Sequence, residues 1–359
     1  MLALPSVFGA APTGDRRAAV RRSPQWDGKA FQNPIPVKMS ASPSVMWEFV
    51  TGGAATRTPD GEVPTEPRTR ADFDEPQALR LTWLGHGTTL VEIEGRRLLI
   101  DPVFSDHASP GRLFGVPRFH APPLPLAELP ALDAVVLTHD HYDHLDHATV
   151  RHLAPSVPRW VCPLGVGAHL ERWGVPADRI TEHDWWDEAE VGGLRLVCTP
   201  ARHFSGRQLL DRNRTLWCGW AVFGDGARLY ATGDGGYGPH FAEIGERLGP
   251  FDATLAESGA YDAAWADVHL GPEQAVRAVV DARGGVMVPV HWGTFNLALH
   301  GWTEPVERVL VAAESGGVPV ATPKPGQPVY VAAPPPVERW WPALDWRSAD
   351  QAPVVSSGL

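Results

Sequence analysis

Cysteine is scarce in this chain of 359 residues, and the three cysteines, Cys162, Cys198 and Cys218, show no regular spacing. Each lies in or beside an apolar, strand-like run. An odd number of cysteines without regular spacing provides no disulfide framework. We therefore expect buried thiols in a reducing compartment, which places the protein in the cytoplasm.

Long apolar runs are also missing, since none approaches the ~20 residues that a membrane-spanning helix needs. The start of the chain, Met1 to Ala11, is mildly apolar, but Arg16 and Arg17 follow it and no positive charge precedes it. We interpret this start as a flexible end and not as a signal peptide. Peripheral contact with a membrane surface stays open.

Clustered basic residues are a third absence. The formal net charge is -11 and the pI is near 5.7, and the usual footprint of a nucleic-acid-binding protein is a basic stripe on one face. We therefore expect no nucleic-acid partner. The hydrophobic fraction of 43% is sufficient for a sizeable core.

The composition divides the chain into three parts. Residues 1–75 are rich in proline and glycine and lack periodicity, which indicates an extended arm with one ordered piece near residues 45–50. Residues 76–333 carry regular apolar patterns and form the expected main domain, which holds the candidate site described below. Residues 334–359 are again rich in proline and are interpreted as a C-terminal tail.

Strand-like runs come first in the central part and then alternate with helical patterns. This order predicts an α/β sandwich of two mixed sheets, with helices on both outer faces. The expected strands are residues 79–84, 89–93, 97–100, 134–137, 194–198, 216–223, 228–231 and 286–290, and the expected helices are residues 144–153, 165–173, 272–283 and 304–315.

The most informative segment follows the strand-like run 134–137. It holds His139, His141, Asp143 and His144, and imidazole nitrogens and carboxylate oxygens are the ligands of Zn²⁺ and related ions. In an extended loop, residues two apart point the same way, so His139 and His141 can bind one ion. Asp143 and His144 would then face a second position nearby. The alternative is a histidine-rich surface turn that binds metal only by accident.

Further candidate ligands lie elsewhere in the chain, each just after an expected strand. They are His203, Asp234 and His291. Functional groups often lie where strands end on such scaffolds. We therefore expect these three side chains to complete a centre for two metal ions.

The chain resembles the hydrolases of the metallo-β-lactamase fold, and among them the N-acyl-phosphatidylethanolamine-hydrolysing phospholipase D family and its bacterial relatives. The resemblance spans roughly residues 25–340. It is carried by Gly85-His86-Gly87-Thr88-Thr89, Asp101-Pro102-Val103-Phe104-Ser105, Ser109-Pro110, the segment from His139 to Asp146, Thr199-Pro200-Ala201-Arg202-His203-Phe204-Ser205-Gly206-Arg207, Gly249-Pro250-Phe251-Asp252 and His291-Trp292-Gly293-Thr294-Phe295.

The resemblance implies two zinc ions and a role for each ligand. By that resemblance the first zinc is held by His139, His141 and His203, the second by Asp143, His144 and His291, and Asp234 bridges both.

Two further residues are expected to support the ligands. Asp101 is the candidate hydrogen-bond partner of a ligating histidine, since such histidines need a partner on their other nitrogen; the alternative is a simple Asp-Pro turn. His86 lies between two glycines at a strand end, which could place it near the site. The alternative is a histidine that only stabilises the turn. Tyr237, Tyr261 and Trp292 are candidate substrate contacts, with core packing as the alternative.

The expected reaction is phosphodiester hydrolysis, in which a hydroxide bridging the two ions attacks phosphorus. Asp234, Asp143 and His291 are the residues expected to carry catalysis, with Asp234 or a metal-bound water protonating the leaving alcohol. A lactone or ester hydrolase on the same fold, and a non-enzymatic metal-dependent binding protein, are the alternatives.

The expected substrate is a small molecule or a phospholipid, and a homodimeric state stays open. A lipid substrate requires an exposed apolar patch beside the metals. The residues that could supply it are Trp47 and Phe49 in the arm, and Leu113, Phe114, Val116 and Phe119 in the proline-rich loop.

Overall fold

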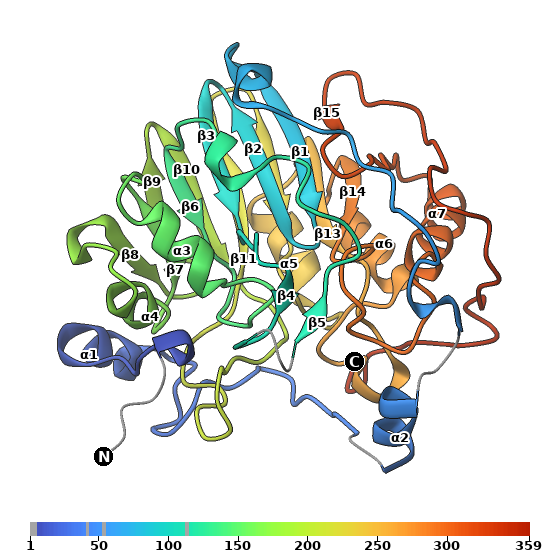
Figure 1. Cartoon of the computed structure of the whole chain (residues 1–359). Helices are drawn as coiled ribbons and strands as arrows, with labels where there is room; N and C mark the ends of the chain where they lie inside the picture. The colour runs from blue at the N-terminus through green and yellow to red at the C-terminus, as the bar shows by residue number, and fades with distance from the viewer. Residues whose placement is uncertain (1–5, 41–42, 52–54, 112–114) are drawn as a thin grey trace.

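Two mixed β-sheets face each other in the computed structural model, which describes residues 6–40, 43–51, 55–111 and 115–359 (Figure 1). The first sheet has seven strands in the order β15-β1-β2-β3-β6-β7-β8 and the second has six in the order β14-β13-β12-β11-β10-β9. Their bounds are β1 Leu79–Gly85, β2 Thr88–Ile93, β3 Arg96–Ile100, β6 Ala134–Val136, β7 Trp160–Pro163, β8 Ile180–His183, β9 Glu188–Val191, β10 Leu194–Thr199, β11 Gly219–Phe223, β12 Arg228–Ala231, β13 Ala253–Glu257, β14 Val286–Val290 and β15 Pro328–Tyr330.

Both sheets change from antiparallel to parallel pairing. Strands β15, β1, β2 and β3 pair antiparallel, and β3, β6, β7 and β8 pair parallel. In the second sheet β9 to β12 are antiparallel, whereas β12, β13 and β14 are parallel. The carboxyl ends of the parallel strands therefore meet at the same end of the sandwich.

Helices cover the outer face of each sheet (Figure 1). They are α3 (His147–Leu153) and α4 (Gly167–Arg172) beside the first sheet, and α5 (His240–Arg247), α6 (Pro272–Asp281) and α7 (Glu304–Gly316) beside the second. Successive side chains along each strand point to opposite faces of its sheet, so each sheet packs against the other sheet on one face and against helices on the other. In β14, Val286, Val288 and Val290 lie in the core between the sheets, while Met287 packs under the helices of the second sheet.

The expected sandwich is confirmed, and most expected elements lie within a few residues of their predicted bounds. Strands β7, β8, β9, β13 and β15 and helix α5 were not predicted. The unpredicted strand β13 bears on the candidate site, because its last residue, Glu257, lies there. The expected helix at residues 144–153 begins only at His147, because Asp146 caps it by accepting a hydrogen bond from the Ala148 N–H.

The described part of the arm contains two α-helices, α1 (Gly14–Arg22) and α2 (Pro43–Thr51), besides short 3-10 turns. The ordered piece expected near residues 45–50 corresponds to α2, whereas α1 was not expected. The arm also contacts the sandwich at Phe31, which is fully buried. Two tryptophans of the tail, Trp340 and Trp341, are buried beside Trp292. In the described part of the chain, no helix has the length and apolarity to cross a membrane.

Candidate metal centre

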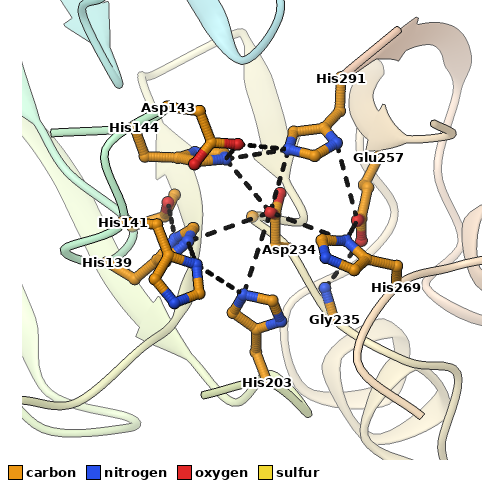
Figure 2. A network of polar contacts seen from close by, with 12 residues as sticks. His139, His141, Asp143, His144, His203, Asp234, Gly235, Glu257, His269 and His291 are labelled. Carbon is orange, nitrogen blue, oxygen red and sulfur yellow. Dashed lines mark hydrogen bonds and ion pairs between the residues drawn. The ribbon is translucent and has the colours of Figure 1, made fainter. Parts of the chain in front are cut away.

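The candidate ligands gather where the strand ends of the two sheets meet (Figure 2). The loop from His139 to His144 follows β6, and His203 lies on the loop after β10. Asp234 follows β12, and His291 follows β14 directly. Sheet register therefore brings together side chains that are far apart in the sequence.

Three imidazoles form the first group. His139 Nε2 lies 2.9 Å from His141 Nδ1, which lies 3.3 Å from His203 Nε2. The His203 ring is oriented by its other nitrogen, because Nδ1 donates to the Val268 carbonyl at 2.6 Å. The three nitrogens thus point at a common position.

The second group combines imidazoles with a carboxylate. His291 Nε2 lies 3.1 Å from His144 Nε2 and 3.3 Å from Asp143 Oδ2. His144 Nε2 lies 3.6 Å from the same oxygen. These atoms surround a second position next to the first.

Asp234 lies between the two groups (Figure 2). Its Oδ2 atom is 3.1 Å from both His144 Nε2 and His291 Nε2. The same oxygen is 3.9 Å from His139 Nε2 and 4.0 Å from His203 Nε2. One carboxylate oxygen therefore faces both positions.

These distances fit metal ions. Zn–N bonds of about 2.0–2.1 Å place the ligand atoms of a tetrahedral ion ~3.3 Å apart. The spacings of 2.9 and 3.3 Å in the first group and 3.1 Å in the second are close to that value. A cluster of buried imidazoles has too few protons to satisfy every converging nitrogen by hydrogen bonds alone, so the donor set suits cations.

The electrostatics of the second position also favour a positive charge. Burial alone would raise the pKa of the Asp234 carboxyl, but the imidazoles of His144 and His291 hold it well below its usual range. In turn, and against the effect of burial, Asp234 and Asp143 raise the pKa of His291 to about 10. In the first group burial dominates and lowers the pKa of His139 and His203 well below the usual range, so these imidazoles are neutral and ready to bind metal.

Asp101 and His86 both contact candidate ligands. Asp101 Oδ2 accepts a hydrogen bond from His144 Nδ1 at 2.8 Å, and the same carboxylate accepts from the Thr138 N–H and hydroxyl at 2.8 and 2.6 Å. His86 Nε2 lies 2.8 Å from Asp143 Oδ2. Asp101 therefore orients an imidazole, and His86 orients a carboxylate.

Three residues of this site other than glycine have positive φ angles. His86, Asp101 and His291 have φ angles of 52°, 42° and 68°. Residues other than glycine rarely adopt such angles, and those that do tend to cluster at functional sites. The surrounding hydrogen bonds hold these three side chains in place.

Two residues of the site, Glu257 and His269, were not identified from sequence. Glu257 ends β13, is buried and hydrogen-bonds His269 Nδ1 through Oε1. Its Oε2 accepts from the Gly235 N–H at 2.7 Å, next to Asp234. Glu257 could have been predicted, because an acidic residue that ends a mostly apolar run at 253–256 resembles the other candidate residues at strand ends. His269 lies in a loop, where no sequence pattern marks it.

The candidate aromatic contacts pack elsewhere. Trp292 is buried and stacks on Trp83 at 5.6 Å between ring centroids. Tyr261 is buried and donates to Glu304, and Tyr237 hydrogen-bonds Asp281. Core packing and local hydrogen bonds account for all three side chains.

Comparison with known proteins agrees with this geometry. Residues 96–292 match the model of the β-lactamase superfamily domain. The fold is shared with Igni18, a metallo hydrolase from Ignicoccus hospitalis, at a TM-score of 0.54 and 24% identity over 70% of this chain and 97% of that chain. The chain belongs to the β-lactamase superfamily and is a metal-dependent hydrolase.

Sequence similarity places it more narrowly. The N-acyl-phosphatidylethanolamine-hydrolyzing phospholipase D 1 of Caenorhabditis elegans is 38% identical over 250 residues, which cover 66% of this chain and 70% of that protein. The protein Rv0906 of Mycobacterium tuberculosis is 48% identical over 347 residues, which cover 94% of this chain and 92% of that protein. The resemblance inferred from the sequence motifs is therefore confirmed.

Proposed function

We propose that this hydrolase holds two zinc ions and hydrolyses phosphodiesters, with N-acyl-phosphatidylethanolamine as the substrate class. The observation that carries the proposal is the placement of Asp234 Oδ2 between two groups of converging ligand atoms. A single carboxylate in that position suits two ions and not one. The substrate class comes from the relationship to the phospholipase D of C. elegans.

In this proposal each ion has its own ligands and one shared ligand. Bound zinc would supply an activated water at neutral pH and would neutralise charge on the phosphoryl oxygens. Two divalent cations outweigh the carboxylates of Asp143 and Asp234, which suits an anionic substrate. The first ion would be held by His139, His141 and His203, the second by Asp143, His144 and His291, and both by Asp234.

The chain's own residues would handle the leaving group. Hydrolysis breaks the bond between phosphorus and the oxygen of the leaving alcohol, and this oxygen takes up a proton. Asp234 is ionised in this site, so it would donate only after taking up the proton of the attacking water, and a metal-bound water is the alternative. His269 is a further candidate, because Glu257 anchors its Nδ1 and, among the described residues, Nε2 has no hydrogen-bond partner. Its side chain is 16% exposed, more than most of the cluster, so a substrate can reach it.

An exposed apolar pair supports a lipid substrate. Leu209 and Leu210 are 100% and 93% exposed on the loop after β10, which also carries His203 (Figure 1, yellow-green loop at the lower edge). The exposed side chains of Arg212 and Arg214 follow in the same loop. Exposed leucines beside cations suit the interface of an anionic bilayer.

The other apolar residues that were expected to contact lipid differ in their exposure. Trp47 is 70% exposed on α2. Leu113, Phe114 and the side chain of Phe49 lie outside the described residues. Val116 and Phe119 are half-buried, and Phe119 packs against the core.

The proposal is tested with zinc-loaded protein and two substrates. A soluble chromogenic phosphodiester reports the chemistry, and N-acyl-phosphatidylethanolamine vesicles report the substrate class through released N-acylethanolamine. We expect turnover of both, lost in His139→Ala. Turnover of the soluble diester alone would contradict the lipid assignment. No turnover of either, with two zinc ions bound, would favour the lactone or ester alternative.

The double substitution Leu209→Ser/Leu210→Ser should impair hydrolysis on vesicles. Each leucine buried in the interface contributes about 1.5–3 kcal/mol, so we expect the vesicle rate to fall at least ten-fold more than the rate on the soluble diester. Val311→Ser, which changes an exposed apolar residue of α7, is the matched control. Equal rate losses on both substrates would show that the loop does not contact the lipid.

A further inference from the structure

The arm reaches the metal centre at Asn33. The Asn33 side chain donates from Nδ2 to the His203 carbonyl at 2.7 Å, and the His203 N–H donates to Asn33 Oδ1 at 3.1 Å. A single amide thus satisfies both backbone groups of a candidate ligand. Asparagine suits this role because its side chain carries a donor and an acceptor together.

His203 is held in a different way from its partners. His139 and His141 belong to one short loop, which is tied to the Asp101 carboxylate through Thr138. His203 instead lies at the start of the long loop whose tip exposes Leu209 and Leu210. The Val268 carbonyl anchors its ring, and Asn33 holds both of its backbone groups.

The arm is anchored on both sides of Asn33. On one side, Phe31 is buried and its N–H donates to the Asn213 carbonyl at 2.9 Å. On the other side, Arg202 Nη2 donates to the Pro36 carbonyl at 2.8 Å. Pro34 restricts the preceding residue to extended conformations. Asn33 therefore lies next to His203 on a segment that has few alternative conformations.

We propose that Asn33 is a positioning residue for His203, and that the N-terminal arm is consequently part of the metal centre. Asn33 would act through the backbone of the ligand and not by touching the ion or the substrate. The inference rests on the proposed dinuclear zinc centre. It does not depend on which substrate is hydrolysed.

The test measures metal binding in the full chain. Zinc affinities are obtained by competition with a chromophoric chelator, and coordination is followed by the absorption spectrum of the cobalt-substituted protein. Outer partners of metal ligands typically contribute about 10–100-fold in affinity. We expect Asn33→Ala to weaken one of the two zinc sites by that factor and to alter the cobalt spectrum. Gln32→Ala, which loses contacts only within the arm, should match the wild type.

Several results would overturn the role of Asn33. One is a folded Asn33→Ala protein with both affinities within two-fold of the wild type and an unchanged spectrum. If Asn33→Ala does not fold, Asn33→Asp decides, since it keeps the acceptor for the His203 N–H but cannot donate to the carbonyl. Wild-type affinity in folded Asn33→Asp, or failure of both variants to fold, would also overturn it. A wild-type protein that binds no zinc would instead overturn the proposed centre.

Discussion

Asp234→Asn should lower kcat on a phosphodiester by on the order of 10²–10³-fold while both metal positions stay occupied. Asparagine has nearly the same shape as aspartate, so an oxygen can remain between the two groups. It lacks the negative charge that faces His144 and His291 at 3.1 Å, and it cannot give a proton to the leaving alcohol. The measurement is kcat together with the metal content of the same sample.

The control for this variant is Asp225→Asn, which removes an exposed carboxylate in a surface turn remote from the cluster. It should retain wild-type kcat. Near-normal turnover in Asp234→Asn, with two ions bound, would falsify a catalytic role for the Asp234 charge. Loss of one ion along with the activity would restrict Asp234 to the role of a ligand.

Glu257→Gln should lower kcat by on the order of 10²-fold with little change in KM. Glutamate accepts hydrogen bonds at both oxygens, from His269 Nδ1 and from the Gly235 N–H. A glutamine can accept from only one of them, and its NH₂ group then faces a donor. The His269 ring loses its orientation and tautomer, and loss of a carboxylate partner costs an active-site histidine up to ~10⁴-fold.

Two further variants complete this test. His269→Gln should lower kcat to a similar degree, and combining both substitutions should add little, because they disrupt one unit. Glu243→Gln, which alters only a surface ion pair with Arg247, should leave kcat unchanged. Fully additive losses in the double variant would show that Glu257 acts independently of His269.

Much of the fold followed from local patterns. Runs such as 286–290 and 228–231 are short, apolar and bounded by turns, so they could be placed closely. The unpredicted strands are less regular. Strand β9, for example, carries acidic side chains at the edge of its sheet, and β13 begins with the small residues Ala253 and Thr254. Their strand conformation depends on pairing with neighbours, which no local pattern reports.

The arm illustrates a second limit. Its low periodicity indicated an extended segment, and hydrophobic patterns gave no reason to expect contact with the metal centre. Besides buried apolar side chains such as Phe31, polar contacts hold it near the site, such as the Asn33 pair with His203 and the Arg202 bond to Pro36. Hydrogen bonds to backbone groups leave no periodic trace in a sequence.

The sequence by itself determined the chemistry available to this protein. The loop from His139 to His144 places several ligands within a few residues, so local geometry alone indicated a metal site, and strand ends indicated the rest. Only the tertiary structure decided which atoms converge. The distances from Asp234 Oδ2 to both groups, and the inclusion of Glu257, His269 and Asn33, arise from sheet register and loop docking. These depend on packing between segments far apart in the chain, where backbone position is set by partners and not by neighbouring residues.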